Sequence, residues 1–222
     1  MLPNSKSRPR RGKPLPRGRH GLSSRAVQTS QKERLIQAML DLVATRGYAR
    51  TTVPEIAAMA RVSPNAFYGF FSDKADCFLA ALAQQASMLL AKINAAATGD
   101  DWTERLGSGL DAYLMWWQER PQVTWAYFVE MPMVGARAVA QRGRAYGPFA
   151  EMFAGIAVAA RKQQPRLRAL PGFLPAMLVI SITEYVAAEV RAGRTAQLIR
   201  LKDDLLFYLV KLLADDATAR RL

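Results

Sequence analysis

The sequence predicts an all-α protein with a small N-terminal domain followed by a larger helical one. Apolar residues recur at helical spacing through most of the chain, and no run alternates apolar and polar residues long enough for a strand. Helix start signals and glycine or proline stop signals divide the chain into segments of helical length. The 222 residues can bury a substantial core in one or two domains.

Residues 1–29 are expected to form a disordered basic arm. They carry eight Lys and Arg residues, no acidic residue and few apolar ones. Such a segment cannot bury enough surface to offset its ordering entropy. No apolar stretch follows the basic residues, so they lack the pattern of a secretory signal, and a cytoplasmic location is expected.

Residues 30–76 are expected to form a three-helix domain. Ser30 and Glu33 have the spacing of a capping box, and Gly47 supplies a stop for the helix that they begin. Four apolar residues of this helix share one face: Leu35, Met39, Leu42 and Val43. This face is expected to form the core of the small domain.

The next two helices have the arrangement of a helix-turn-helix. Thr52 begins one of them with a second capping box, and its N-terminus suits a phosphate. Ser63 caps the other, in which Pro64 occupies the first turn. Two short helices joined by a turn of three or four residues place the second helix in the DNA major groove.

Positive charge is concentrated in the N-terminal third of the chain. The formal net charge is +13, and residues 1–75 carry 14 Lys and Arg residues against 4 Asp and Glu. A DNA-binding surface needs such an excess to pair with phosphates. A basic surface that meets only solvent is the alternative, and the helix-turn-helix pattern favours DNA.

Residues 34–79 resemble the DNA-binding domain of the TetR/AcrR family of transcriptional regulators. Three motifs carry the resemblance: Gly47-Tyr48, the run from Thr52 to Ala57, and the run from Val62 to Lys74. The resemblance implies a homodimeric repressor that a small effector releases from a palindromic operator in double-stranded DNA. The family often has glycine where this chain has Arg61, so Arg61 must accept an unusual backbone angle or a different turn.

The expected DNA contacts lie around the third helix. Asn65 is the candidate for reading a base, because an amide can pair with adenine, and a solvated helix-start residue is the alternative. Tyr68 and Lys74 match family positions that hold phosphates. The full expected set is Thr52, Arg61, Ser63, Pro64, Asn65, Ala66, Tyr68 and Lys74.

Residues 77–222 are expected to form the helical domain that binds an effector and holds the dimer. Start and stop signals place its helices near residues 75–97, 101–120, 122–130, 135–163 with a kink or break at Gly147-Pro148, a helix to about 191, and 196–213. The last two helices are apolar on more than one side and must be buried on more than one side.

A second copy of the chain is the simplest cover for those helices, and two-fold symmetry suits palindromic DNA. An ordinary core position is the alternative for each residue. The expected dimer residues are Ile182, Tyr185, Leu198, Leu201, Leu205, Leu209 and Leu212.

Large, soft side chains gather between residues 100 and 180, and such residues line small-molecule pockets. The family resemblance implies an inducer pocket there. The expected effector-binding residues are Tyr113, Trp117, Phe128, Phe149, Met152 and Met177. Few charges occur nearby, so the effector is expected to be apolar or aromatic.

Several other classes of protein are disfavoured. The single cysteine, Cys77, excludes an internal disulfide and a multi-cysteine metal site, and the single histidine, His20, has no partners at metal-ligand spacing. No enzyme, metal or cofactor motif is found, and the longest apolar run is too short to span a bilayer. A constitutive DNA-binding regulator or architectural protein without a ligand remains the alternative.

Overall fold

The structure, a computed structural model, describes residues 24–214, and this part of the chain is entirely helical in its regular structure. The elements are α1 (Ser24–Arg46), α2 (Val53–Ala60), α3 (Pro64–Tyr68), α4 (Lys74–Ala96), α5 (Trp102–Gln118), α6 (Pro121–Trp125), the π-helix η1 (Ala126–Glu130), the 3₁₀-helix η2 (Met131–Val134), α7 (Ala136–Gln163), α8 (Leu174–Arg191), the 3₁₀-helix η3 (Thr195–Leu201) and α9 (Lys202–Leu213).

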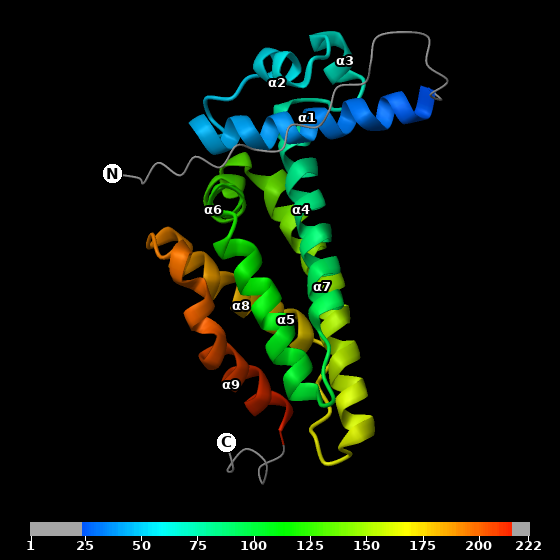
Figure 1. The fold of residues 1–222 in the computed structure, drawn as a ribbon, viewed down its shortest axis with the longest axis vertical. Coiled ribbons are helices and arrows are strands. Elements are labelled where there is room, and N and C mark those ends of the chain that lie inside the picture. The colour runs from blue at the N-terminus through cyan, green and yellow to red at the C-terminus, as the bar shows by residue number, and fades with distance from the viewer. Residues whose placement is uncertain (1–23, 215–222) are drawn as a thin grey trace.

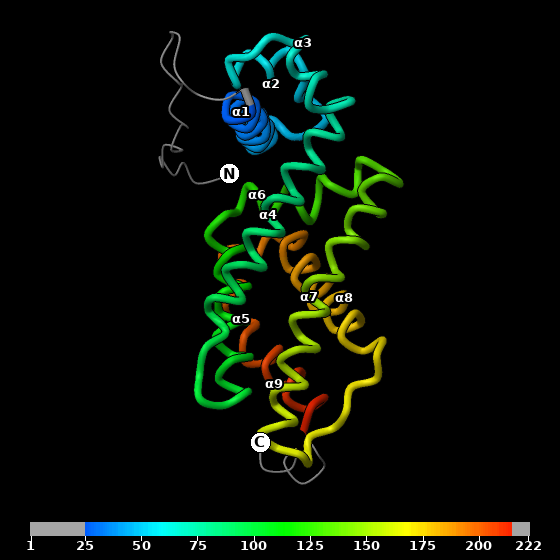
Figure 2. The backbone as a smooth tube through the Cα atoms, turned by 90° about the vertical axis from the view of Figure 1, so that its right-hand side faces the viewer, coloured from blue at the N-terminus to red at the C-terminus, as the bar shows by residue number. Residues whose placement is uncertain are grey.

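The molecule has two parts, which α4 joins. In Figure 1, α1 lies across one end with α2 and α3 stacked on its outer side, and α4 runs from this small domain down into a bundle formed by α5 to α9. The tube in Figure 2 shows the same separation after a quarter turn. The predicted all-α architecture with an N-terminal helix-turn-helix is confirmed.

The core of the small domain forms as the apolar pattern predicts. Leu35, Met39, Leu42 and Val43 of α1 are all buried. Ile56 of α2 packs in the same cluster, together with Phe67 and Phe71 from α3 and the segment after it. The two phenylalanine rings lie 5.6 Å apart, so α3 is anchored by aromatic side chains on its inner face.

The start of α1 differs from the prediction. The helix begins at Ser24 rather than Ser30, so Ser30 and Glu33 lie inside it. Residues 24–29 belong to the segment expected to be disordered, but Arg25, Ala26 and Gln28 are good helix formers that let the helix extend N-terminally. The rest of the expected basic arm, residues 1–23, lies outside the described residues.

In the larger domain, α5 is the central helix. It packs against α4 on one side and against η3 and α9 on another, while α7 packs against both α4 and α8. Its tryptophans Trp116 and Trp117 are buried, as is Phe128 of η1. Aromatic burial of this kind dominates the stability of a small helical core.

Two helix boundaries in this domain also differ from the prediction. The break expected at Gly147-Pro148 is absent, and α7 continues through Pro148. Pro148 removes the helical hydrogen bond to the carbonyl of Arg144, but Arg144 is exposed, so the freed carbonyl can meet water. The last predicted helix begins with the 3₁₀ turn of η3 before α9 follows.

Four leucines expected at a dimer interface are buried within the protomer itself. Leu198, Leu201, Leu205 and Leu209 are each at most 9% exposed, on elements that pack against α5 of the same chain. They are core residues, so this part of the interface prediction is wrong. An apolar helix face has the same sequence pattern whether its own chain or a second copy covers it.

No helix among residues 24–214 combines the length and the apolar character that a bilayer crossing needs. The same residues contain no cluster of His, Cys, Asp and Glu that could hold a metal ion.

Candidate DNA-binding surface and ligand cavity

The turn between α2 and α3 is closed by an arginine in a left-handed conformation. Arg61 has φ 56° and ψ 45°, and it is the one non-glycine residue with positive φ in the part of the chain that the structure describes. The N–H of Arg61 donates to the carbonyl of Ala58 at 3.1 Å, and the N–H of Val62 donates to Ala57 at 3.0 Å. This paired ending satisfies the last carbonyls of α2 and fixes where α3 begins. The unusual backbone angle expected at Arg61 is confirmed.

A partly buried clamp holds the same turn from the side of α1. Arg34 donates from Nη1 to the carbonyl of Ala60 at 2.7 Å, at the C-terminal end of α2. A guanidinium is favourable there, because the carbonyls of a helix C-terminus carry partial negative charge. The clamp ties α1 to the turn and therefore orients the recognition helix.

α3 presents a short exposed face beside this turn. The Oγ of Ser63 accepts a hydrogen bond from the N–H of Ala66 at 3.1 Å, which caps the helix. Pro64 and Asn65 are exposed, and Tyr68 is 58% exposed. Arg61, which precedes the helix, is also exposed, and α3 lies on the outer side of α1 at the end of the molecule (Figure 1). The side opposite is anchored by Phe67.

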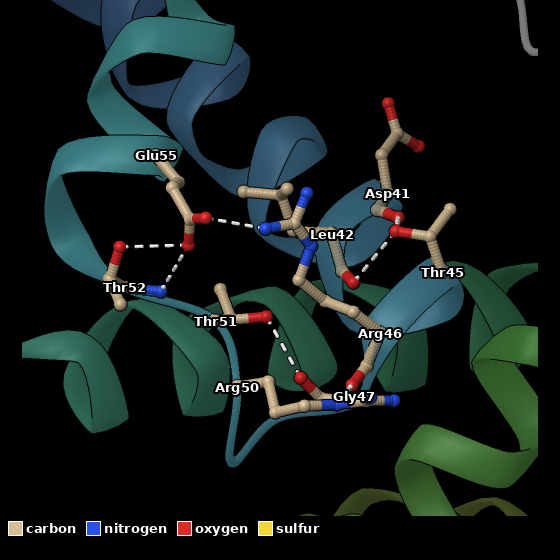
Figure 3. Close-up of polar contacts among 9 residues, drawn as sticks. All are labelled: Asp41, Leu42, Thr45, Arg46, Gly47, Arg50, Thr51, Thr52 and Glu55. Atoms are coloured by element: carbon tan, nitrogen blue, oxygen red, sulfur yellow. Dashed lines mark hydrogen bonds and ion pairs between the residues drawn. The ribbon is translucent and has the colours of Figure 1, made fainter.

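Two other expected DNA contacts have partners within the protein. In Figure 3, the backbone N–H and the Oγ1 of Thr52 both donate to Oε2 of Glu55, at 3.0 and 2.8 Å. Glu55 also forms an ion pair with Arg46. The hydrogen bond from the Thr52 hydroxyl lowers the pKa of Glu55 most, and the Thr52 N–H and Arg46 lower it further. The carboxylate already complements the N-terminus of α2, the place expected to suit a phosphate.

Lys74 is likewise directed into the protein. Its Nζ donates to the carbonyls of Tyr48 at 2.9 Å and Ala49 at 3.4 Å, and it lies 4.3 Å from the centre of the Tyr48 ring. The ammonium holds the connection between α1 and α2 against the start of α4. Any phosphate contact by Lys74 would have to compete with these bonds.

The connection between α1 and α2 is tightened by local hydrogen bonds (Figure 3). Thr51 donates from Oγ1 to the carbonyl of Gly47 at 2.9 Å, and Arg50 donates from Nε to the carbonyl of Arg46 at 2.8 Å. Gly47 has φ 83°, which a residue with a side chain adopts only under strain. The glycine stop predicted for the first helix is confirmed.

Charge on the folded part of the small domain is modest. Residues 24–75 contain seven Lys and Arg residues against four Asp and Glu, while the other seven basic residues of the N-terminal third lie in residues 1–23, outside the described residues. Most of the excess charge that predicts phosphate binding therefore lies outside the described residues.

Two polar joints connect the small domain to the larger one. Glu130, at the end of η1, accepts a hydrogen bond from the N–H of Tyr48 at 2.7 Å. Arg137 of α7 donates from both terminal nitrogens to Asp73, each at 2.8 Å. Asp73 also caps α4 by accepting from the N–H of Asp76, and the Arg137 guanidinium lowers the pKa of Asp73 to about 2.

A cavity of about 110 Å³ lies between α4, α5, α7 and α8. Four predicted effector-binding residues line it: Tyr113, Trp117, Phe149 and Met152. Its lining on α5 runs from Arg105 to Trp117, which corresponds to roughly 18 Å of helix. Apart from Arg105, the lining residues are uncharged and mostly aliphatic or aromatic.

Two of the predicted effector-binding residues lie elsewhere. Met177 does not line the cavity and is 54% exposed on the outside of α8. Phe128 is buried behind the cavity wall, with its ring 4.9 Å from that of Trp117. Neither residue lines this cavity, because the neighbours of a helical residue depend on the rotation of its helix, which the apolar pattern of these helices leaves open.

Several lining residues were not predicted. Tyr127 and Tyr146 line the cavity, as do Thr183 and Ile182, the last of which was expected at a dimer interface. Tyr127 lies on the π-helix, whose extra residue per turn rotates it relative to an α-helix, and no sequence signal marks that turn. Ile182 and Thr183 would have been recognised had the inner face of α8 been assigned correctly.

The polar groups of the cavity are unevenly distributed. The Oη of Tyr113 and the Nε1 of Trp117 are buried, and neither has a hydrogen-bond partner of normal geometry among the described residues. Thr183 and Trp117 are nevertheless near enough to Tyr113 to lower its pKa. Burial raises the pKa of Tyr113 above its ordinary value and raises that of Tyr127 to about 12. Tyr146 accepts a hydrogen bond from Nε of Arg142 at 2.6 Å.

An exposed recognition helix held by α1, together with a bundle that encloses an apolar cavity, defines a helix-turn-helix DNA-binding protein. Residues 35–81 match the sequence model of the bacterial regulatory proteins of the tetR family. The N-terminal part of the chain therefore carries the DNA-binding domain described by that model.

Solved structures of such regulators share the whole fold. FadR from Bacillus subtilis, in complex with stearoyl-CoA, superposes with a TM-score of 0.70 at 16% identity, covering 82% of this chain and 99% of that one. FadR from Bacillus halodurans superposes with a TM-score of 0.69 at 16% sequence identity, covering 82% of this chain and 99% of that one. A tetR-family protein from Rhodococcus RHA1 superposes with a TM-score of 0.61 at 20% sequence identity, covering 83% of this chain and 98% of that one. Curated protein sequences give no match to this chain.

Proposed function

We propose that this chain is a homodimeric repressor that binds palindromic DNA through α3 and dissociates from it when a small, largely apolar ligand fills the cavity. One observation carries the ligand-dependent part of this proposal. Tyr127, which lines the cavity, and Glu130, which bonds to the N–H of Tyr48 in the small domain, lie on the same π-helical turn. A ligand that displaces Tyr127 must therefore shift the segment that contacts the DNA-binding domain.

The apolar character of the ligand follows from the cavity wall. Aliphatic and aromatic side chains form nearly all of it, and a charged ligand group away from Arg105 would lose its hydration there without a partner. The fold neighbour from Bacillus subtilis was solved with stearoyl-CoA, a ligand with a long apolar chain. This neighbour supports an elongated apolar moiety as the first ligand class to try.

The proposed dimer face is the exposed side of α8 and α9. Five large apolar side chains are exposed there: Met177, Ile180, Tyr185, Phe207 and Tyr208. Tyr208 and Ser181 lie within hydrogen-bond distance, 3.3 Å, which places the two helices side by side. Such a patch is unusual on a monomer, and a second copy related by two-fold symmetry would cover it.

Both polar joints would transmit the ligand signal. Glu130 lies just before η2 and contacts the loop after α1. Arg137 lies at the start of α7 and contacts Asp73 at the start of α4. Ligand binding would favour a dimer state in which the two recognition helices no longer match the half-site spacing. A constitutive regulator without a ligand is the alternative, and the cavity counts against it.

The experiment is a selection of DNA fragments bound by the purified full-length protein, followed by titration of the best fragment with stearoyl-CoA and with apolar aromatic compounds. The proposal expects one palindromic motif and loss of binding on ligand addition. Gly109→Leu, which adds a side chain at the cavity wall, should weaken the ligand response, whereas Gly143→Leu at an open position on α7 should not. A DNA complex that no compound of either class weakens would contradict ligand control.

A further inference from the structure

The unpaired polar atoms of the cavity lie together on α5. Tyr113 and Trp117 are four residues apart, so they project from one face of the helix, with ring centres 6.4 Å apart in an edge-on arrangement. Trp117 is 2% exposed, and the Tyr113 hydroxyl is fully buried. Thr183 and Trp117 lie near enough to Tyr113 to lower its pKa, but neither the Tyr113 hydroxyl nor the Trp117 N–H has a hydrogen bond of normal geometry. A buried polar group without such a bond is costly, so two of them at one place in an apolar cavity indicate a binding position.

The chemistry of the two groups defines what can bind between them. An indole N–H can only donate a hydrogen bond. Burial raises the pKa of Tyr113, so its phenol keeps its proton at neutral pH and can also donate. Thr183, which is buried and lines the same region, adds a hydroxyl. The complementary ligand atom is therefore a hydrogen-bond acceptor.

The surroundings indicate that this acceptor is uncharged. Arg105, the charged residue of the lining, is eight residues before Tyr113, which is about 12 Å along α5, and its Nε donates to the carbonyl of Gly99. Arg142, which reaches Tyr146, is paired with Glu184. A carboxylate between Tyr113 and Trp117 would thus be buried without a counter-charge.

An unpaired indole alone does not mark a site in this protein. The Nε1 of Trp116 is also buried without a partner, but Trp116 does not line the cavity, and Arg120 lies 4.0 Å from its ring centre. The signal at Trp117 is the coincidence of a cavity and a second donor, Tyr113. Trp116 therefore provides a control within the same helix.

We propose that the ligand of this regulator is an uncharged apolar compound whose ketone, ester or amide oxygen binds between Tyr113 and Trp117. This inference rests on the proposed ligand-binding function of the cavity and specifies the orientation of the ligand. The acceptor oxygen lies at the end of the cavity nearest η1, and the apolar body extends along α5 towards Arg105.

The test uses three probes that share one ring system: naphthalene, methyl naphthyl ketone and naphthoate. Binding of each is measured by calorimetry to the full-length protein and to Tyr113→Phe, Trp117→Phe and the control Trp116→Phe. We expect the ketone to bind about five- to tenfold more tightly than naphthalene, and naphthoate to bind more weakly than both. Tyr113→Phe should remove most of the ketone's advantage and leave naphthalene affinity unchanged, and Trp116→Phe should change neither.

The outcomes separate this inference from the proposed function. Equal binding of ketone and naphthalene, or an advantage that survives Tyr113→Phe, would overturn the acceptor site while leaving an apolar ligand cavity intact. Tightest binding by naphthoate would also overturn it, since an anion would then be preferred. If none of the three probes binds and no compound releases DNA, the ligand-dependent function fails and this inference fails with it.

Discussion

At the scale of single residues, Arg61 combines a strained backbone with an exposed charge, and substitutions can measure the effect of each one separately. A left-handed conformation costs a residue with a side chain about 1 kcal/mol or more, which glycine avoids. Arg61→Gly is therefore expected to stabilise the protein by about 0.5–1 kcal/mol, after the larger unfolded-state entropy of glycine is subtracted. Thermal or urea unfolding measures this change.

Arg61→Ala is the matched control, because it removes the same charge but keeps the strain. If the glycine variant is no more stable than the alanine variant, the strain argument is wrong. DNA affinity should fall equally in both variants, since each lacks the guanidinium beside α3.

Asn65 is expected to read a base rather than a phosphate. It is exposed at the first turn of α3, and an amide can form a paired contact with adenine. Asn65→Ala should weaken binding to the selected operator by about 1–3 kcal/mol while binding to random DNA stays nearly unchanged. Asn94→Ala, at an exposed asparagine near the other end of α4, is the control, and equal losses on both DNAs would exclude base reading by Asn65.

The residues of the DNA surface could be predicted from the sequence where a local motif decides their position. Ser63 caps α3 and Asn65 is exposed because both positions follow from the helix start. Lys74 could not be placed, since its partner Tyr48 is 26 residues away and only the packing of α4 against α1 brings them together. The same limit applies to Thr183, whose place in the cavity depends on how α8 is rotated.

At the scale of elements, α9 has one apolar face buried against the protomer core and another that is exposed, so a substitution on each face should have a different effect. Phe207, which is 55% exposed, is expected to contact a second copy, so Phe207→Arg should give a folded monomer. Leu205 is buried, so Leu205→Arg should unfold the protein or lower its stability by about 3 kcal/mol or more. Light scattering and circular dichroism distinguish the two results.

A Phe207→Arg protein that remains dimeric would place the interface elsewhere. A Leu205→Arg protein that is folded and monomeric would restore the interface first expected from the sequence. The helical pattern of α9 shows two apolar faces, but which one faces α5 follows from the 3₁₀ turn of η3, which the pattern does not indicate.

The joint between α4 and α7 should make stability depend on pH. Asp73 has a pKa of about 2, below its ordinary 3.8, because Arg137 bonds to its charged form. A lowered folded-state pKa adds stability above about pH 4, and that stability is lost as pH falls from about 3.8 towards 2. The contribution is small, since both side chains are about half exposed.

Arg137→Gln is therefore expected to lower the melting temperature at neutral pH, with the difference from the native protein shrinking below pH 4. Arg144→Gln, at an exposed arginine of the same helix that contacts only Gln141 among the described residues, should show no such trend. A difference that stays constant down to pH 3 would show that Asp73 is not responsible.

At the scale of the whole molecule, the positive charge and the recognition helix belong to different parts of the chain. Residues 1–23 carry seven Lys and Arg residues and no acid. Deleting them should leave helicity and melting temperature almost unchanged, because few of these residues are apolar and a segment of this composition contributes little to a packed core. If they make roughly two to four phosphate contacts, the slope of log affinity against log salt should fall by about 2 to 4.

The cut belongs after residue 23 rather than residue 29, since α1 begins at Ser24. A truncated protein that keeps the full slope would show that these residues do not bind DNA. Replacing the seven basic residues by glutamine at constant length is the companion variant, and it should reproduce the truncation.

Fold class and domain order followed from the sequence because helix periodicity and the recognition motif are local signals. The cavity and the joints did not, since each depends on helices distant in sequence that meet in space, as Tyr48 and Glu130 do. Their positions follow from packing, which a single sequence does not specify.

Three cations of the folded small domain are engaged within the protein: Arg46 by Glu55, Arg34 by the carbonyl of Ala60, and Lys74 by two carbonyls of the loop after α1. Free charge governs how often a protein meets DNA, whereas contacts at base edges govern how long it stays. We therefore expect changes in residues 1–23 to alter the association rate and changes in α3 to alter the dissociation rate. The speed with which the protein finds DNA and the time for which it stays bound would then be adjustable independently in this chain.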